Sequence, residues 1–73
     1  MVVEGTVGRI ADYGAFVDVG VGRDGLIHIS KLAEGFVERV ENVVHSGDRV
    51  RVAVLDIDLD RRRIALRLIE VLH

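Results

Sequence analysis

The chain has 73 residues, a net charge of −2 and no cysteine. A chain of this length makes one domain that buries only about 60% of the surface its unfolded state exposes, and without cysteine neither disulfides nor thiolate metal sites can stabilise it. Its apolar runs are far shorter than the ~20 residues of a membrane span, and no charged-then-apolar leader opens the sequence. We therefore expect one soluble, cytoplasmic domain over residues 1–73, without a membrane partner.

The first half of the sequence predicts three strands separated by turns that contain glycine. Residues 3–10 form the first strand, in which Gly5 and Gly8 allow a bulge or a strong bend. Residues 12–14 turn into a second strand at 15–19, and a glycine-rich hairpin loop at 20–25 leads to a short third strand at 26–29. Ser30 then offers a cap for a helix or turn.

The second half predicts helical turns followed by two more strands. Apolar residues within 31–46 recur at spacings near three and four, which favours short helical turns over one barrel end, with Phe36 in the core. Alternating apolar residues predict strands at 49–54 and 63–68, with a polar loop at 56–62 between them. Five strands with a helical insert between the third and the fourth are typical of an all-β, OB-fold barrel.

Strand alternation places several rings on the outer surface. The small apolar residues at 15, 17 and 19 form the core set of the second strand, so Phe16 projects outward. The isoleucines at 27 and 29 can face the core in the same way, so His28 projects to the other side. With Tyr13 these rings gather on one face, and flat rings outside a core are a platform for the bases of single-stranded nucleic acid. The alternatives are an ordinary exposed aromatic at Phe16 and a structural histidine at His28.

The cations are nearly all arginines, and three of them are consecutive. Arginine can both fork onto a phosphate and stack on a base, which lysine cannot. Because the net charge is −2, any attraction for nucleic acid must come from local patches. Arg61, Arg62 and Arg63 are the densest cluster, which either forms a solvated loop or supplies phosphate contacts beside the rings.

The sequence contains patterns typical of cofactor, metal and catalytic sites, but each lacks the neighbouring residues or elements that such a site needs. The glycines at 20, 22 and 25 match a dinucleotide-binding fingerprint, but a strand follows them where that fingerprint needs a helix. The aspartates at 56, 58 and 60 resemble a calcium loop, but arginines stand at its glycine and closing glutamate positions, so the carboxylates are expected to order the turn or pair with arginines. The histidines at 28, 45 and 73 have no zinc spacing, and neither Ser30 nor Ser46 has an evident acid partner. We predict no cofactor, no metal and no enzymatic activity.

Most of the sequence resembles the S-one (S1) RNA-binding domain. The resemblance rests on residues 5–7, 12–17, 24–30, 47–48 before a valine-rich strand, 54–58 and 63–66. The family includes the repeats of the largest bacterial small-subunit ribosomal protein and a module at the end of polynucleotide phosphorylase, so it implies a role in translation or RNA processing. Residues 35–41 look like the phosphorylase version and residues 55–61 like the ribosomal repeats, which leaves the parent protein open.

The resemblance also implies which residues contact RNA. The family's cluster of two aromatics, a histidine, an aspartate and an arginine falls here on Tyr13, Phe16, His28, Asp58 and Arg63. The resemblance alone singles out Asp58, whereas the other four already follow from alternation and charge. Tyr13 stands where phenylalanine is common and should still stack on a base.

These observations predict a non-catalytic module that binds single-stranded RNA with little sequence preference, through ring stacking and arginine–phosphate contacts. Its expected partners are single-stranded RNA and, as part of a larger chain, the ribosome or an RNA-degrading enzyme. The alternative is a protein-interaction module whose rings bury against a protein partner, which the net acidity favours. The salt dependence of binding distinguishes these two functions. For a single strand, the logarithm of the binding constant falls against the logarithm of the salt concentration with a slope near −0.7 per phosphate contact.

Overall fold

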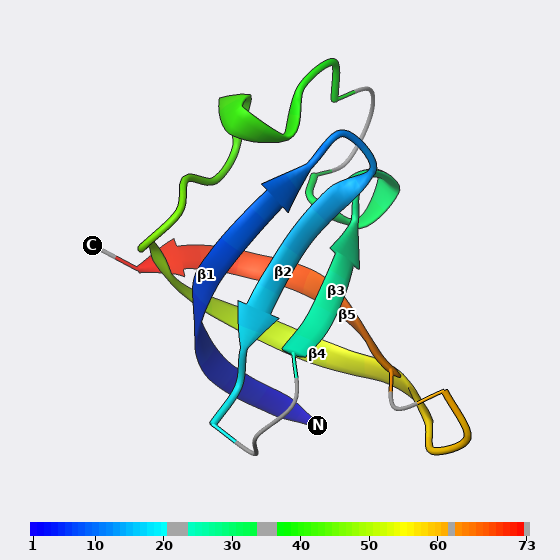
Figure 1. Ribbon diagram of the computed structural model, residues 1–73. Coiled ribbons are helices and arrows are strands. Elements are labelled where there is room, and N and C mark those ends of the chain that lie inside the picture. The colour runs from blue at the N-terminus through cyan, green and yellow to red at the C-terminus, as the bar shows by residue number, and fades with distance from the viewer. Residues whose placement is uncertain (21–23, 34–36, 62, 73) are drawn as a thin grey trace.

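Five strands close into a barrel in the computed structural model, which describes residues 1–20, 24–33, 37–61 and 63–72 (Figure 1). The strands are β1 (Val2–Ala11), β2 (Gly14–Asp18), β3 (Asp24–His28), β4 (Arg49–Asp58) and β5 (Arg63–Leu72). Their order around the barrel is β1-β2-β3-β5-β4, and β4 pairs with β1 to close it. All neighbours are antiparallel except β3 and β5, which run parallel. The predicted all-β, OB-like fold class is confirmed.

The connection from β3 to β4 covers one end of the barrel (Figure 1). It contains two single-turn 3-10 helices, η1 (Ile29–Lys31) and η2 (Val40–Asn42), so the predicted short helical turns are confirmed. Leu32, Val40 and Val44 are fully or almost fully buried and join this segment to the core. Phe36, which we expected in the core, lies outside the described residues. In the described part of the chain, no helix combines the length and the apolar character needed to cross a membrane.

Aliphatic side chains fill the barrel because every second residue of a strand faces inward. The buried strand residues are Val7, Ala15, Val17, Ile27, Val50, Val52, Ile64 and Leu66. The residues that alternate with them are exposed, as at Asp18, Arg63 and Arg67, or half-buried, as at Phe16 and Arg51. The alternation used for the prediction therefore holds in the part of each strand that encloses the core.

The largest differences from the predicted elements lie in β4 and β5, and β5 runs to Leu72, past its predicted end at 68. We expected a polar loop over residues 56–62, but β4 continues to Asp58, and its last three residues pair with 63–65 of β5. In Figure 1 this hairpin extends past the rest of the barrel. Ile57 is accordingly half-exposed, because the alternation of apolar and acidic residues continues past the part of the strand that covers the core. The predicted loop is therefore wrong over its first three residues.

Smaller differences concern β2 and β3. Both strands begin earlier than predicted, so Asp24 and Gly25 belong to β3 and not to the preceding loop. Ile29 begins η1 and does not end the strand. The reason is antiparallel pairing, since Asp18 is the partner of Asp24 and Gly14 that of His28, which extends both strands to matched ends.

Register shifts at bulges redirect side chains on β1 and β4. On β1, Gly8 and Arg9 both face the single residue Phe16, which confirms the bulge that Gly8 was expected to allow. On β4, Leu55 and Asp56 both face Ala65 of β5. A bulge adds a residue on one strand, increases its twist and turns a side chain in a new direction. Arg9 and Leu55 both border the surface described next.

Candidate nucleic-acid interface

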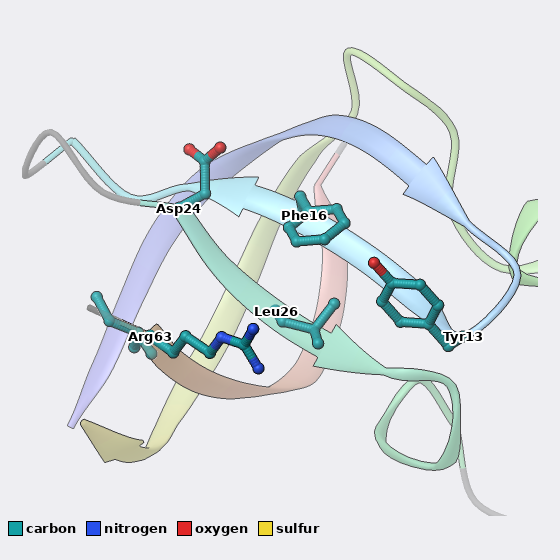
Figure 2. A pocket seen from close by; sticks show the side chains of 6 residues that line it. Tyr13, Phe16, Asp24, Leu26 and Arg63 are labelled. Carbon is teal, nitrogen blue, oxygen red and sulfur yellow. The ribbon is translucent and has the colours of Figure 1, made fainter. Parts of the chain in front are cut away.

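A hollow of about 360 Å³ opens on the outer face of β2, β3 and the start of β5. Its lining consists of Tyr13, Phe16, Asp24, Leu26, Arg63 and Ile64, and we call it the aromatic hollow. Figure 2 shows Phe16 and Leu26 on neighbouring strands, Tyr13 beyond Phe16, and the Arg63 side chain extending toward Leu26. Phe16 and Leu26 are direct cross-strand partners, which explains their contact with the same space. The result is an apolar floor with a guanidinium at one edge and a carboxylate at another.

The Phe16 ring has neighbours on two sides. The Tyr13 ring meets it edge to face, with centroids 6.1 Å apart and planes at 85°. The Arg9 guanidinium carbon lies 4.5 Å from the Phe16 centroid, within the range of a cation–π contact. Arg9 reaches the ring because the β1 bulge sets it opposite Phe16. Since Phe16 lines the hollow and Arg9 does not, the ring keeps an open side toward the hollow.

His28 is both an exposed ring and a helix cap. Its Nδ1 accepts the backbone N–H of Ser30 at 3.2 Å and lies 2.8 Å from the Ser30 hydroxyl. It is therefore the N-cap of η1, and Ser30, expected to be the cap, lies inside that helix. His28 lines a second, smaller hollow of about 230 Å³ that adjoins the aromatic one at Leu26 and Arg63.

Asp58 and Arg61 lie at the turn between β4 and β5, outside the lining of the aromatic hollow. The Asp58 carboxylate accepts the backbone N–H of Arg61 at 3.2 Å and lies 3.8 Å from the Arg61 Nε. The two side chains are 41% and 74% exposed, so this ion pair adds little stability. It orders the turn from which Arg63 emerges, as expected for these carboxylates. Arg62 lies outside the described residues.

The structure therefore divides the predicted site residues into groups. Tyr13, Phe16 and Arg63 line the aromatic hollow, and His28 lines the adjoining one together with Arg63. Leu26 is absent from the predicted site although it forms the floor of both hollows. Its signal was present in the sequence, because the alternation that turns Ile27 inward turns Leu26 outward beside His28.

Comparison with known proteins finds an RNA-binding family. A family model described as S1 RNA binding domain matches residues 1–69. Protein YhgF of Escherichia coli (strain K12) is 54% identical over 66 residues, which cover 90% of this chain and 8% of that protein. The small ribosomal subunit protein bS1 homolog of Bacillus subtilis is 48% identical over 71 residues, covering 97% of this chain and 18% of that protein. The solution structure of GSP13 from Bacillus subtilis matches with a TM-score of 0.87 at 37% identity, covering 93% of this chain and 52% of that one. The chain thus spans less than a fifth of the length of these two curated relatives.

Proposed function

The chain belongs to the S1 RNA-binding domain family, and we propose that residues 1–73 act as a non-catalytic module for single-stranded RNA with little sequence preference. The observation that carries the proposal is the aromatic hollow, in which two rings, a leucine floor and an arginine share one exposed face. Every base has a π-face, so stacking on such rings tolerates any sequence and contributes about 1–3 kcal/mol per base.

The geometry supports a separate role for each ring. Tyr13 and Phe16 stand nearly perpendicular, so one base cannot lie flat on both. We assign Phe16, which Arg9 holds from the β1 side, as the platform for one base, and Tyr13 as a contact for a neighbouring base. Arg63 can fork onto a phosphate or stack on a base at the other side of Leu26. Asp24 at the rim can accept a hydrogen bond from a ribose hydroxyl or a base amine.

The Ser30 hydroxyl lies 2.8 Å from His28 Nδ1, and this contact supports a capping role and not nucleophilic catalysis. The same nitrogen accepts the Ser30 backbone N–H, which is the geometry of a helix cap. Within the described residues, no carboxylate bonds to the other ring nitrogen to orient it, as a catalytic histidine would need.

The test is a titration of the protein with a labelled uridine or adenosine oligomer. Phe16→Ala and His28→Asn should each weaken binding by about 1–3 kcal/mol, since each removes one ring. Asparagine is used at position 28 because it preserves the N-cap acceptor of η1, so a lost ring is not confused with a lost cap. Ile69→Ala is the matched control, because Ile69 is an exposed apolar residue of β5 outside both hollows. Undiminished affinity in a folded double variant would refute the stacking model.

A further inference from the structure

A row of outward-facing residues crosses the barrel from β2 to β4. Phe16 is the partner of Leu26, Leu26 is the partner of Ala65, and Ala65 faces the β4 bulge at Leu55. Three strand-to-strand steps of ~4.8 Å give the row a length of about 14 Å. Successive nucleotides of a stacked strand rise ~3.4 Å each along the strand axis. The row is therefore longer than one nucleotide.

The hollow of about 230 Å³ lies over the β3–β5–β4 part of this row. Its floor is aliphatic, formed in part by Leu26, Leu55 and Ala65, and its rim carries His28, Lys31 and Arg63. It shares Leu26 and Arg63 with the aromatic hollow, and Figure 2 shows the Arg63 side chain reaching toward Leu26 where the two adjoin. The two hollows therefore form one continuous surface.

The chemistry of this second hollow fits an occupant that is apolar and anionic at once. Leu55 is a large apolar side chain that remains 48% exposed, so covering it is favourable. Lys31 and Arg63 make no ion pair within the described residues, so both charges are available to an anion. A nucleotide presents a flat base for the aliphatic floor and a phosphate for the cations.

We propose that the second hollow binds the nucleotide next to the one stacked on Phe16, with its base over Leu26 and Leu55 and its phosphate between Lys31 and Arg63. This inference rests on the proposed function and extends it from the aromatic rings to an aliphatic subsite. Continuity with the aromatic hollow favours the adjoining nucleotide of the same strand over an acidic peptide, which has similar charge but would not need the rings.

The experiment follows leucine methyl and Phe16 ring NMR signals of the wild-type protein during titration with a uridine hexanucleotide. We expect the Leu55 methyl signals to shift together with the Phe16 ring, while those of Leu59 stay unchanged. Leu59 is the matched control because it lies in the same hairpin, is 71% exposed and lines neither hollow. Leu55→Ser should weaken hexanucleotide binding about fivefold, near the low end for loss of a base platform, and Leu59→Ser should leave it unchanged. Lys31→Gln should flatten the salt slope by about 0.7.

The outcomes separate this inference from the function on which it rests. A shifted Phe16 ring with unmoved Leu55 methyls, or equal affinities of the two leucine variants, would overturn the second subsite and leave RNA binding intact. A hexanucleotide that moves neither signal would overturn the proposed function itself. Leu55 shifts caused by an acidic peptide but not by the hexanucleotide would assign the hollow to a protein partner. The wild-type NMR result stands even if Leu55→Ser fails to fold.

Discussion

Phe16 depends on its neighbours for its orientation, and Arg9 is the neighbour that can be changed without touching the core. Arg9 is exposed and contacts the ring from β1, outside the hollow. It therefore restrains the ring that we propose as a base platform, without occupying the proposed place of the base. This predicts an effect of Arg9 on affinity that does not come from a phosphate contact.

Arg9→Gln should lower RNA affinity about twofold to fivefold, because an exposed cation–π contact is worth about 0.5–1 kcal/mol. The salt slope should stay the same, and Arg9→Lys should fall between wild type and Arg9→Gln. Fluorescence anisotropy over a salt series measures both quantities. A flatter slope in Arg9→Gln would show instead that Arg9 leaves the ring and binds phosphate.

Alternation predicted the directions of Phe16 and His28 because it depends only on each residue's own strand. The contact between Arg9 and Phe16 could not be predicted in the same way, since it requires the register of two strands and the position of a bulge. The capping role of His28 depends on a 3-10 helix that is only three residues long, for which periodicity gives no signal.

At the scale of elements, the pairing of β2 with β3 requires a residue without a side chain at Gly14. A Cβ there would collide with the backbone oxygen of Ile27 and lie 3.1 Å from the His28 Cα, and these backbone atoms cannot move without separating the strands. Neither Gly14 nor Gly25 has a positive φ, so close approach explains them and conformational freedom does not.

Gly14→Ala should destabilise the fold by about 1–3 kcal/mol, the usual range for overpacking. For a domain of this size, each kcal/mol lowers the melting temperature by roughly 4–8 °C. Gly8→Ala is the control, since its Cβ would meet only the Phe16 carbonyl at 3.8 Å, an ordinary contact. Thermal unfolding followed by circular dichroism measures both variants. Equal melting temperatures would mean that the two strands can separate at no cost.

The number and sequence order of the strands were predictable because apolar alternation marks every strand that covers the core. The end of β4 was predicted as a loop because of the aspartates at 56, 58 and 60, although the apolar residues between them continue the alternation and Asp56 and Asp58 pair with β5. The parallel pairing of β3 with β5 joins segments far apart in sequence, and only the resemblance to a known fold implied it.

At the scale of the whole molecule, the net charge of −2 opposes binding to RNA, so the distribution of charge must provide the attraction. Three acidic residues, Asp12, Glu38 and Glu41, line a separate hollow with Arg39, whereas Asp24 is the acidic residue that lines the aromatic hollow. Arg51, on the outer side of β4, is paired with Glu70. Lys31 and Arg63 border the proposed RNA surface.

Two phosphate contacts, at Lys31 and Arg63, predict a salt slope of about −1.4 for RNA binding by the wild-type protein. Arg63→Gln should flatten it by about 0.7 and weaken binding, because this side chain lines both hollows. Arg51→Gln removes one positive charge from a protein of net charge −2, as Arg63→Gln does. Because Arg51 is already paired with Glu70, its replacement should leave the slope unchanged. Anisotropy titrations over a salt series compare the three proteins. Equal flattening in both variants would mean that binding follows the overall charge, and a wild-type slope of zero would favour a protein partner over RNA.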